Sequence, residues 1–239
     1  QWPNLLTYLI QRFPGVSESE WRQRFHGGLV YDEAGQALAP DCPYLPGRVI
    51  FYFRFLPPEP VIPFAAQILF EDDHILVADK PHFLPVTPAG RFLTETLLTR
   101  LRRETGNDDL VPLHRIDRET AGLVLFSKRR DSRERYSALF RNRLIDKVYE
   151  VIAPINPELN FPLRYCGHMQ AGSPFFRMEI GDGEPNSETE ISLIGSHAGW
   201  GHFQVRPITG RKHQIRVHFA ALGMPILFDA IYPILAPDT

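Results

Sequence analysis

The sequence contains few cysteines, no long apolar run and no strong excess of charge of either sign, and each absence excludes a class of protein. Cys42 and Cys166 lie in no spacing that is typical of a disulfide framework or a zinc site, which fits a reducing cytoplasm. No apolar stretch approaches the roughly 18 residues that a transmembrane helix needs. We therefore expect a cytoplasmic chain without a membrane partner, and its 239 residues suffice for a sizeable core.

The formal net charge of −2 argues at first against a nucleic-acid partner, but the charges are unevenly distributed. Residues 91–147 contain 14 Lys and Arg against 9 Asp and Glu, a balance of +5. Residues 196–228 contain four basic residues and no acid, which leaves −11 for the rest of the chain. Basic segments of this kind can follow a phosphate backbone, so RNA stays a possible partner.

The densest group of charges is the segment HRIDRETAG at residues 114–122, which runs directly into the apolar residues 123–126. Asp117 lies between Arg115 and Arg118, and nearby positive charge favours the ionised form of a carboxylate. An ionised carboxylate on a turn ahead of a buried strand is suited to act as a nucleophile or a base. An ordinary surface loop, in which Asp117 offsets two arginines, explains the same residues.

A second dense segment, TGRKHQIRVHF, occupies residues 209–219. Thr209 is predicted to cap a helix whose apolar stripe is formed by Ile215, Phe219 and Leu222. His213 and Arg216 are three residues apart and should share a face beside that stripe. Two such segments in one chain are unexpected by chance.

Together these segments resemble the RluA family of RNA pseudouridine synthases. The family motif H-R-[LI]-D-R-x-T-[SA]-G-[LI] around the catalytic aspartate is matched by residues 114–123, and T-G-R-x-H-Q-[IL]-R-x-H is matched by residues 209–218. An acidic and apolar strand that leads to Lys80-Pro81 and a Lys-x-Tyr motif at residues 147–149 are also present. The four motifs occur in the family's order between residues 64 and 229, which makes the resemblance specific.

The resemblance implies that the protein isomerises uridine to pseudouridine in a stem-loop of rRNA or tRNA. It assigns the catalytic carboxylate to Asp117, its paired cation to Arg216, and the aromatic face for an extruded uracil to Tyr149. Whether Asp117 attacks the sugar, attacks the base or takes a ribose proton stays open. Five further residues are predicted to bind substrate: Arg115, Arg118, Ile215, Arg211 and His114.

These five residues are expected to differ in their roles. Ile215 should close the apolar wall of the pocket, whereas Arg115 and Arg118 should contact phosphates or the position vacated by the base. Arg211 and His114 are expected to support the loop more than to touch substrate.

The expected reaction moves the glycosidic bond from N1 to C5 of uracil without a change of oxidation state, so no cofactor is predicted. The histidines and cysteines show no metal-ligand spacing, so no metal is predicted either. The expected partner is RNA rather than DNA, and the resemblance favours a monomer.

Two other classes of function are compatible with parts of this pattern. The chain could be a non-catalytic RNA-binding module, although the presence of Asp117, Arg216 and Tyr149 together argues against this. It could also be a metal-free hydrolase that uses Asp117 with a second carboxylate, but no second acid occurs in a recognisable motif.

The chain is expected to divide into a small α+β domain at residues 1–58 and a catalytic domain at residues 61–239. The first domain resembles the RNA-binding domain named after ribosomal small-subunit protein four, although only Arg22 and Arg24 supply the basic charge of its second helix. A stiff Pro-rich linker is predicted at residues 56–60. The domain at residues 1–58 is expected to contain a helix at 5–10, a second helix after a capping box formed by Ser17 and Glu20, and strands near 27–31 and 47–54.

The catalytic domain is predicted to belong to the α+β class, with a mixed, mainly antiparallel sheet flanked by helices as in the pseudouridine synthase fold. By resemblance it ends earlier than the family's domain does. Strands are expected at 68–70, 75–78, 122–127, 147–153, 189–194 and 202–207, and helices at 94–104, 131–144 and 211–222. Residues 156–187 are rich in proline and glycine and give no clear assignment.

Overall fold

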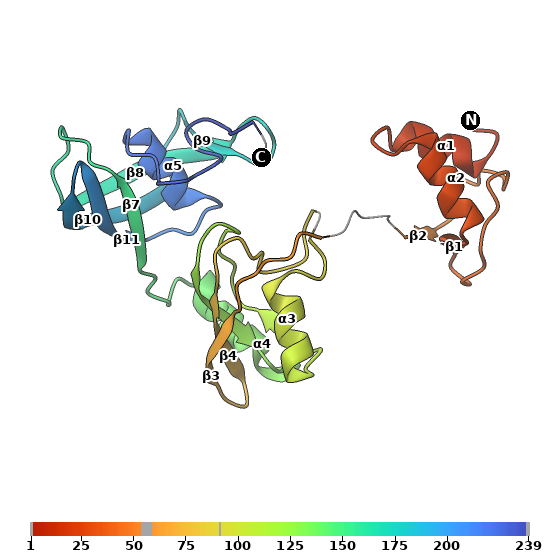
Figure 1. Ribbon diagram of the computed structural model, residues 1–239, viewed down its shortest axis with the longest axis horizontal. Helices are drawn as coiled ribbons and strands as arrows, with labels where there is room; N and C mark the ends of the chain where they lie inside the picture. Colours follow the sequence, from red (N-terminus) through yellow and green to blue (C-terminus); the bar gives the residue numbers. More distant parts are fainter. Residues whose placement is uncertain (1, 54–58, 91, 238–239) are drawn as a thin grey trace. The chain divides into compact units, whose positions relative to one another are not determined.

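The computed structural model describes residues 2–53, 59–90 and 92–237. Its contacts divide the chain into two units, Gln1–Pro58 and Glu59–Thr239, which are described separately below (Figure 1). The linker predicted at residues 56–60 falls largely on residues 54–58, which lie outside the described part of the chain.

The first unit consists of two helices and a short hairpin. The helices are α1 (Leu5–Arg12) and α2 (Glu18–His26), and the strands are β1 (Val30–Asp32) and β2 (Ile50–Tyr52). The predicted capping box is confirmed, because the backbone N–H of Glu20 donates to Ser17 and that of Ser17 donates to Glu20. Trp21 is fully buried at the centre of this unit's core. An RNA-binding role for the unit stays a prediction.

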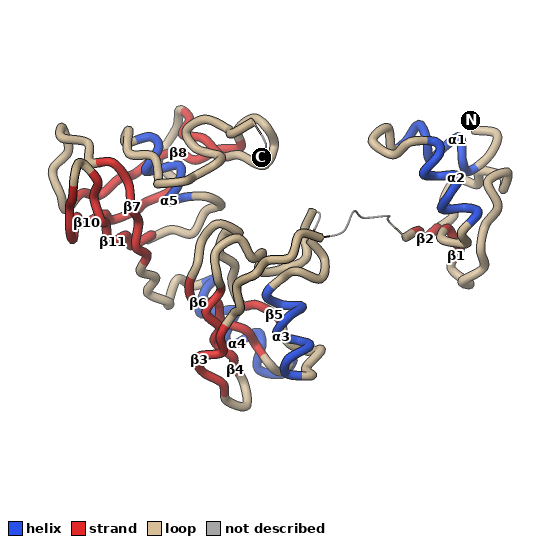
Figure 2. Tube along the Cα trace, in the orientation of Figure 1, coloured by secondary structure: helices blue, strands red, loops and turns tan. Residues whose placement is uncertain are grey.

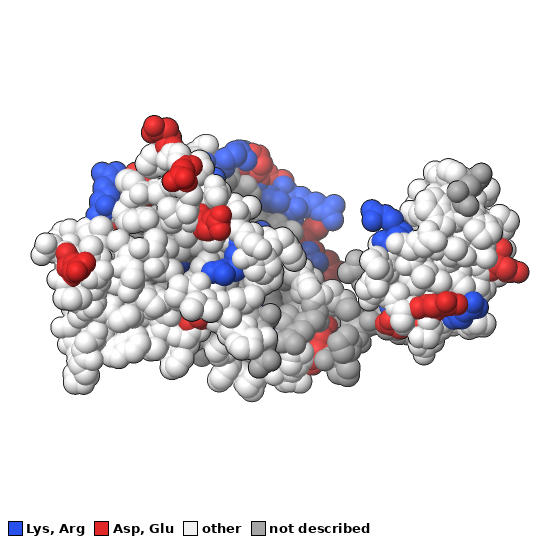
Figure 3. Space-filling model, turned by 90° about the horizontal axis from the view of Figure 1, so that it is seen from above, with Lys and Arg blue, Asp and Glu red and all other residues white. Residues whose placement is uncertain are grey.

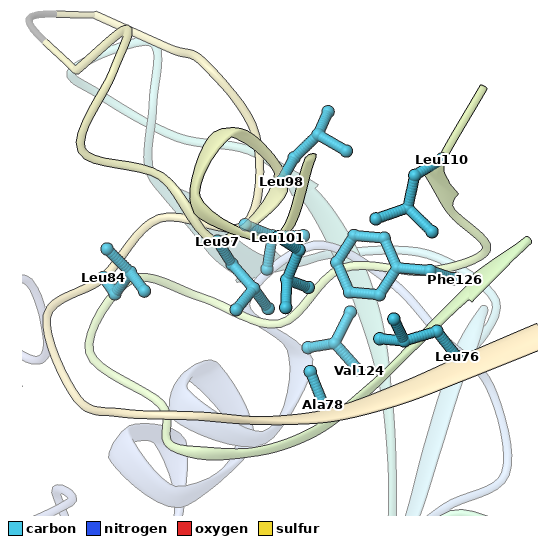
Figure 4. Packing of buried hydrophobic residues seen from close by; sticks show 10 residues of the cluster. Leu76, Ala78, Leu84, Leu97, Leu98, Leu101, Leu110, Val124 and Phe126 are labelled. Carbon is cyan, nitrogen blue, oxygen red and sulfur yellow. The ribbon is translucent and has the colours of Figure 1, made fainter. Parts of the chain in front are cut away.

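The second unit begins with a four-stranded antiparallel sheet in the order β3-β4-β6-β5. Its strands are β3 (Gln67–Glu71), β4 (Ile75–Lys80), β5 (Val111–Pro112) and β6 (Gly122–Ser127). The strands predicted at 68–70 and 75–78 are confirmed, and they pair as an antiparallel hairpin. The helix α3 (Leu97–Thr105) packs against this sheet, and Figure 4 shows Leu97 and Leu101 directed at Phe126 and Val124. This core supports the strand that follows the Asp117 loop.

Two predicted helices of this region have different ends in the structure. Helix α3 begins at Leu97 rather than at residue 94, because Thr96 is its N-cap and accepts a hydrogen bond from the N–H of Thr99. Helix α4 (Arg130–Arg141) ends before residue 144, since Arg143 adopts a left-handed φ of 57° that interrupts the helix.

A five-stranded antiparallel sheet in the order β7-β11-β10-β8-β9 forms the rest of the second unit (Figure 2). The segment 156–187, which the sequence left unassigned, contains two of its strands, β8 (Leu163–Ala171) and β9 (Met178–Gly181). The other strands are β7 (Tyr149–Pro154), β10 (Ser187–His197) and β11 (Trp200–Pro207). The apolar stripe of helix α5 (Gln214–Ala221) packs on this sheet, with Phe219 against Phe203.

The prediction that Thr209 caps this last helix is wrong. Helix α5 begins only at Gln214, after His213, which has a left-handed φ of 56° and makes no side-chain cap. The Thr209 hydroxyl instead donates to the Gln214 side chain at 2.7 Å and accepts from the N–H of Glu188 at 2.9 Å. Residues 209–213 therefore form a loop that is fastened to β10.

The predicted α+β class is confirmed, and every strand pair among the described residues is antiparallel. The strands of the second unit are divided between two sheets, and helix α5 lies on the five-stranded one (Figure 1). In the portion of the chain that the structure describes, no helix has the length and apolar character that crossing a membrane requires.

Candidate active site

The structure brings Asp117 and Arg216 together, although 99 residues separate them in the sequence. Arg216 Nη1 donates to Asp117 Oδ2 at 2.9 Å. Asp117 lies on the loop ahead of β6 of the four-stranded sheet, and Arg216 lies on α5, the helix that packs on the five-stranded sheet. The Arg216 side chain is 9% exposed and that of Asp117 is 30% exposed, which leaves the carboxylate accessible.

Asp229, which the sequence reasoning did not single out, is the second carboxylate that contacts Arg216. Arg216 Nε and Nη2 donate to its two oxygens, each at 2.7 Å. Asp229 also accepts hydrogen bonds from the backbone N–H groups of Ile231 and Tyr232. Burial alone would raise the pKa of Asp229, but the hydrogen bonds from Arg216 outweigh it and hold that pKa below its usual value.

Arg216 is thus a fully engaged guanidinium held in a fixed orientation. Burial opposes its charge, yet the hydrogen bonds to Asp229 and the charge of Asp117 raise its pKa above the ordinary value. The guanidinium carbon of Arg216 lies 5.2 Å from the centroid of the Tyr232 ring, a distance at which a cation is attracted to the face of an aromatic ring. Bidentate pairing of this kind suits arginine and would not suit lysine.

His213 lies near the other oxygen of Asp117 and is held by Tyr232. The N–H of Met178 donates to the Tyr232 hydroxyl at 2.7 Å, and that hydroxyl is hydrogen-bonded to His213 Nδ1 at 2.9 Å, which leaves Nε2 facing Asp117. Burial lowers the pKa of His213. His213 Nε2 is 3.9 Å from Asp117 Oδ1.

Tyr149 is the first residue of β7, and it lies with Ile215 at the margin of the core under α5. Burial, together with the negative charge of Asp117, raises the pKa of the Tyr149 phenol. The phenol is therefore neutral at pH 7 and close enough to Asp117 to be influenced by its charge. Asp117 and Arg216 are in direct contact, and a role for Tyr149 beside them stays a prediction.

Lys80 holds the loop that carries Asp117 through a hydrogen bond to the backbone of Arg118. The sequence did not place Lys80 in the catalytic set. Lys80 is fully buried, and its Nζ donates to the carbonyls of Pro81, Leu84 and Arg118 at 3.0, 2.8 and 3.1 Å. Burial lowers its pKa to about 8. Lys80 is accordingly a positioning residue of this loop.

His114 and Arg211, two predicted substrate-binding residues, make framework contacts in the structure. His114 Nε2 accepts from the N–H of Leu125 at 3.2 Å, its ring stacks on Phe140, and burial lowers its pKa to about 4. Arg211 Nε donates to the carbonyl of Asn186 at 2.8 Å. This agrees with the expectation that both residues support their loops, and a direct contact with substrate stays a prediction.

Arg115 and Arg118, the two arginines beside Asp117, have different surroundings. Arg118 pairs with Glu119 at 2.9 Å and lies over the ring of Phe92. Arg115 is exposed and, among the residues described, has no side-chain hydrogen bond or ion pair. It is therefore the cation of this loop that is available to an anionic ligand.

Of the two carboxylates that accept hydrogen bonds from Arg216, Asp117 is the more accessible. Asp117 Oδ1 has no hydrogen-bond partner within the described structure, whereas both oxygens of Asp229 are occupied and its side chain is only 3% exposed. Glu119 is a further, partly exposed carboxylate near the site, because its Oε2 lies 4.0 Å from Arg216 Nη1. The described residues also contain no group of three or more His, Cys, Asp or Glu side chains that could hold a metal ion.

Comparison with known proteins identifies the family of this chain. Residues 74–221 match the RNA pseudouridylate synthase family, and this range contains Asp117, Tyr149 and Arg216. A protein of Synechocystis named as an uncharacterised RNA pseudouridine synthase is 30% identical over 239 residues, which cover 95% of this chain and 79% of that protein. The chain belongs to the RNA pseudouridine synthase family, a family of isomerases, so the resemblance drawn from its motifs is confirmed.

Further relatives show how much of their length this chain represents. The mitochondrial tRNA pseudouridine(32) synthase of Saccharomyces cerevisiae is 32% identical across 72% of this chain and 38% of that protein. Other relatives are named ribosomal large subunit pseudouridine synthases. The solved structure of human RNA pseudouridylate synthase domain containing 4 has a TM-score of 0.56 and 27% identity, and the match covers 69% of this chain and 68% of that one. The chain spans about a third of the human and mouse relatives.

Proposed function

We propose that this chain isomerises a uridine to pseudouridine in a structured RNA, with Asp117 as the catalytic carboxylate. In this reaction the bond from ribose C1′ to uracil N1 breaks and the base turns. A bond from C1′ to C5 then forms, the proton on C5 is lost to solvent, and N1 gains a proton. The balance needs no oxidant, reductant or cofactor.

The observation that carries the proposal is that only one of the two oxygens of Asp117 accepts a hydrogen bond. Oδ2 accepts a hydrogen bond from Arg216, which fixes the orientation of the group, while Oδ1 has no hydrogen-bond partner in the described residues. A carboxylate in this state can attack the ribose or the base, or take a proton from the ribose. All three routes use the same ionised group.

The surroundings of Asp117 suit an extruded nucleotide. A base that reacts at its glycosidic bond must leave its stack, and the rings and apolar side chains beside the site offer it a new surface. Tyr149 is proposed to stack on the uracil, and Ile215 to close the apolar side of the pocket. The exposed Arg115 is proposed to contact an RNA phosphate or the place that the uracil leaves.

The substrate is proposed to be a stem-loop of tRNA or rRNA. The names of the relatives support this choice, since they include synthases for each of these RNAs. The two basic stretches of the sequence contain Asp117 and Arg216, so positive charge accompanies the site. On the face drawn in Figure 3, most Lys and Arg side chains of the second unit lie along its upper edge with Asp and Glu side chains among them, and most of that face is uncharged.

We also propose that the protein acts as a monomer in the cytoplasm. Asp117, Arg216, Tyr149 and Asp229 all come from one chain, so the site is complete without a second copy. Cys42 and Cys166 are free thiols, which is compatible with a reducing compartment.

The experiment that tests the proposal uses RNA transcripts labelled with tritium at C5 of uridine. Pseudouridine formation replaces the C5–H bond by a C–C bond, so the wild-type protein should release tritium into water. Asp117→Asn should release none while it binds the same RNA. No release by the wild type on tRNA and rRNA transcripts, or persistent release by Asp117→Asn, would contradict the proposal.

A further inference from the structure

Two phenylalanines in the second unit are exposed and also have left-handed backbone conformations. Phe83 has a φ of 67° and is 51% exposed, and Phe228 has a φ of 62° and is 91% exposed. A positive φ is an outlier for a bulky residue, since its Cβ crowds the backbone there. Because these rings gain little burial in return, packing in the fold does not account for them.

Phe228 is directly adjacent to the carboxylate that holds Arg216. The N–H of Asp229 donates to the carbonyl of Ile226 at 3.1 Å, which places Phe228 at the third position of a four-residue turn. A positive φ at this position favours glycine. The turn nevertheless presents an exposed aromatic ring one residue before Asp229, whose carboxylate holds Arg216 against Asp117.

Phe83 occupies the corresponding place beside the Asp117 loop. The preceding residue, His82, donates from Nδ1 to the carbonyl of Glu119 at 2.6 Å. Lys80, at the start of the same turn, donates to the carbonyl of Arg118 at 3.1 Å. The turn that carries Phe83 is therefore fastened to the two residues that follow Asp117 in the chain.

We propose that Phe83 and Phe228 are stacking platforms for unpaired RNA bases that lie next to the target uridine. Unpaired bases in loops stack on exposed aromatic side chains, and this contact tolerates different base identities. The exposed Arg115 supplies a positive charge for the phosphates of the same nucleotides. Strained backbone concentrates at functional sites, where ligand contacts compensate for it. The inference rests on the proposed function and adds a recognition element to it.

The test measures binding of the full chain to two fluorescent RNA probes, a hairpin transcript with an unpaired uridine-containing loop and a blunt duplex of the same stem. Phe83→Ala and Phe228→Ala each remove a ring, and the new side chain keeps the Cβ that causes the backbone strain. Each should weaken hairpin binding roughly five- to hundredfold and leave duplex binding unchanged. Phe70→Ala is the control, because Phe70 is 50% exposed on the edge strand β3, and it should bind both probes as the wild type does.

Phe83→Gly and Phe228→Gly separate the loss of the ring from any loss of folding. Glycine accepts a positive φ without strain, so each Gly variant should unfold at a higher temperature than the Ala variant at the same position. Both variants should nevertheless bind the hairpin equally poorly. Phe→Trp at either position should restore hairpin binding.

Three results would overturn this inference while leaving the catalytic proposal intact, provided that the wild type releases tritium from C5-labelled RNA. The first is wild-type affinity of both Ala variants for the hairpin. The second is equal wild-type affinity for hairpin and duplex. The third is a change from dimer to monomer on ring removal in size-exclusion chromatography, which would assign the rings to a protein contact.

Discussion

The loop of Asp117 and the loop of Asp229 present the same functional group to the same guanidinium, yet their surroundings differ in almost every respect. The Asp229 side chain is 3% exposed. It accepts two hydrogen bonds from Arg216 and two more from backbone N–H groups. Asp117 is 30% exposed and accepts one hydrogen bond from Arg216. The number of hydrogen bonds and the degree of exposure therefore separate an anchoring carboxylate from a reactive one.

This difference shows how one arginine can serve two purposes. Asp229 balances the charge of Arg216 and fixes its orientation, so that Nη1 is directed at Asp117. Since the anchoring is done by Asp229, Asp117 needs no further partner and keeps Oδ1 open. The reactive loop is in turn supported by Lys80 and His114 rather than by contacts to its own carboxylate.

The largest effect on this arrangement should come from removing the shared partner. Arg216→Met leaves two carboxylates unpaired, one of them buried, and should lower the free energy of unfolding by about 3–5 kcal/mol. It should also abolish tritium release from RNA. Arg141→Met is the control, because the Arg141–Glu134 pair is exposed and should contribute less than about 1 kcal/mol. Similar stability losses for the two variants, measured by urea unfolding, would contradict the role of Arg216.

The next largest effect should be a loss of stability in acid, caused by a buried histidine on helix α5. His218, on the same helix, is fully buried, and burial lowers its pKa to about 4. As the pH falls, His218 takes up a proton in the unfolded chain before it does so in the folded protein. The contribution of neutral His218 to the free energy of unfolding is therefore complete above pH 6.5, decreases as the pH falls towards 4, and is absent below that. The shift corresponds to on the order of 3 kcal/mol.

Urea unfolding between pH 7 and pH 4 measures this effect. His218→Gln should reduce the dependence of stability on pH and leave the part that comes from His114, whose pKa burial also lowers to about 4. His197→Gln, at the exposed end of β10, should leave the dependence unchanged. An identical slope for wild type and His218→Gln would show that His218 does not determine the acid sensitivity.

A smaller effect is expected when the anchoring carboxylate loses only its charge. Asp229→Asn keeps an acceptor for Arg216 but removes the charge-assisted hydrogen bonds, and should cost about 2 kcal/mol of stability. It should retain measurable pseudouridine formation, because Asp117 is still present. Asp131→Asn, at an exposed ion pair with Arg129, provides the control and should change stability by less than about 1 kcal/mol. Complete loss of activity in Asp229→Asn, with stability intact, would mean that Asp229 takes part in the chemistry.

The same two loops show how far the sequence could predict the site. The Asp117 loop could be predicted because its charges, its turn and the following strand are contiguous, and the helix of Arg216 has a regular apolar stripe. Asp229 could not be predicted in this way, because its partner on α5 is 13 residues away and its other bonds are to backbone groups of a non-repetitive turn. Only tertiary packing places these groups together.

Among the helices and strands, those marked by a local sequence pattern could also be predicted, and those set by distant residues could not. The helix with leucines at 97, 98 and 101 and the strand at 122–127 were predicted, since periodicity and buried apolar runs mark them locally. Strands β8 and β9 were not, because proline and glycine interrupt their segment and their pairing with β10 and with each other is set by distant residues. The start of α5 was misplaced because Thr209 bonds to Gln214 and Glu188 instead of capping the helix.

The smallest effect on stability and the largest on chemistry should be found in one variant, Asp117→Asn. Its stability should change by less than about 1 kcal/mol, because the side chain is partly exposed and makes a single hydrogen bond to Arg216. The most direct test measures pseudouridine yield and RNA affinity of this variant beside Asp229→Asn. We expect wild-type affinity and no pseudouridine for Asp117→Asn, and lower stability with residual pseudouridine for Asp229→Asn. The reverse pattern, with product from Asp117→Asn and none from a folded Asp229→Asn, would contradict the assignment of the reactive carboxylate.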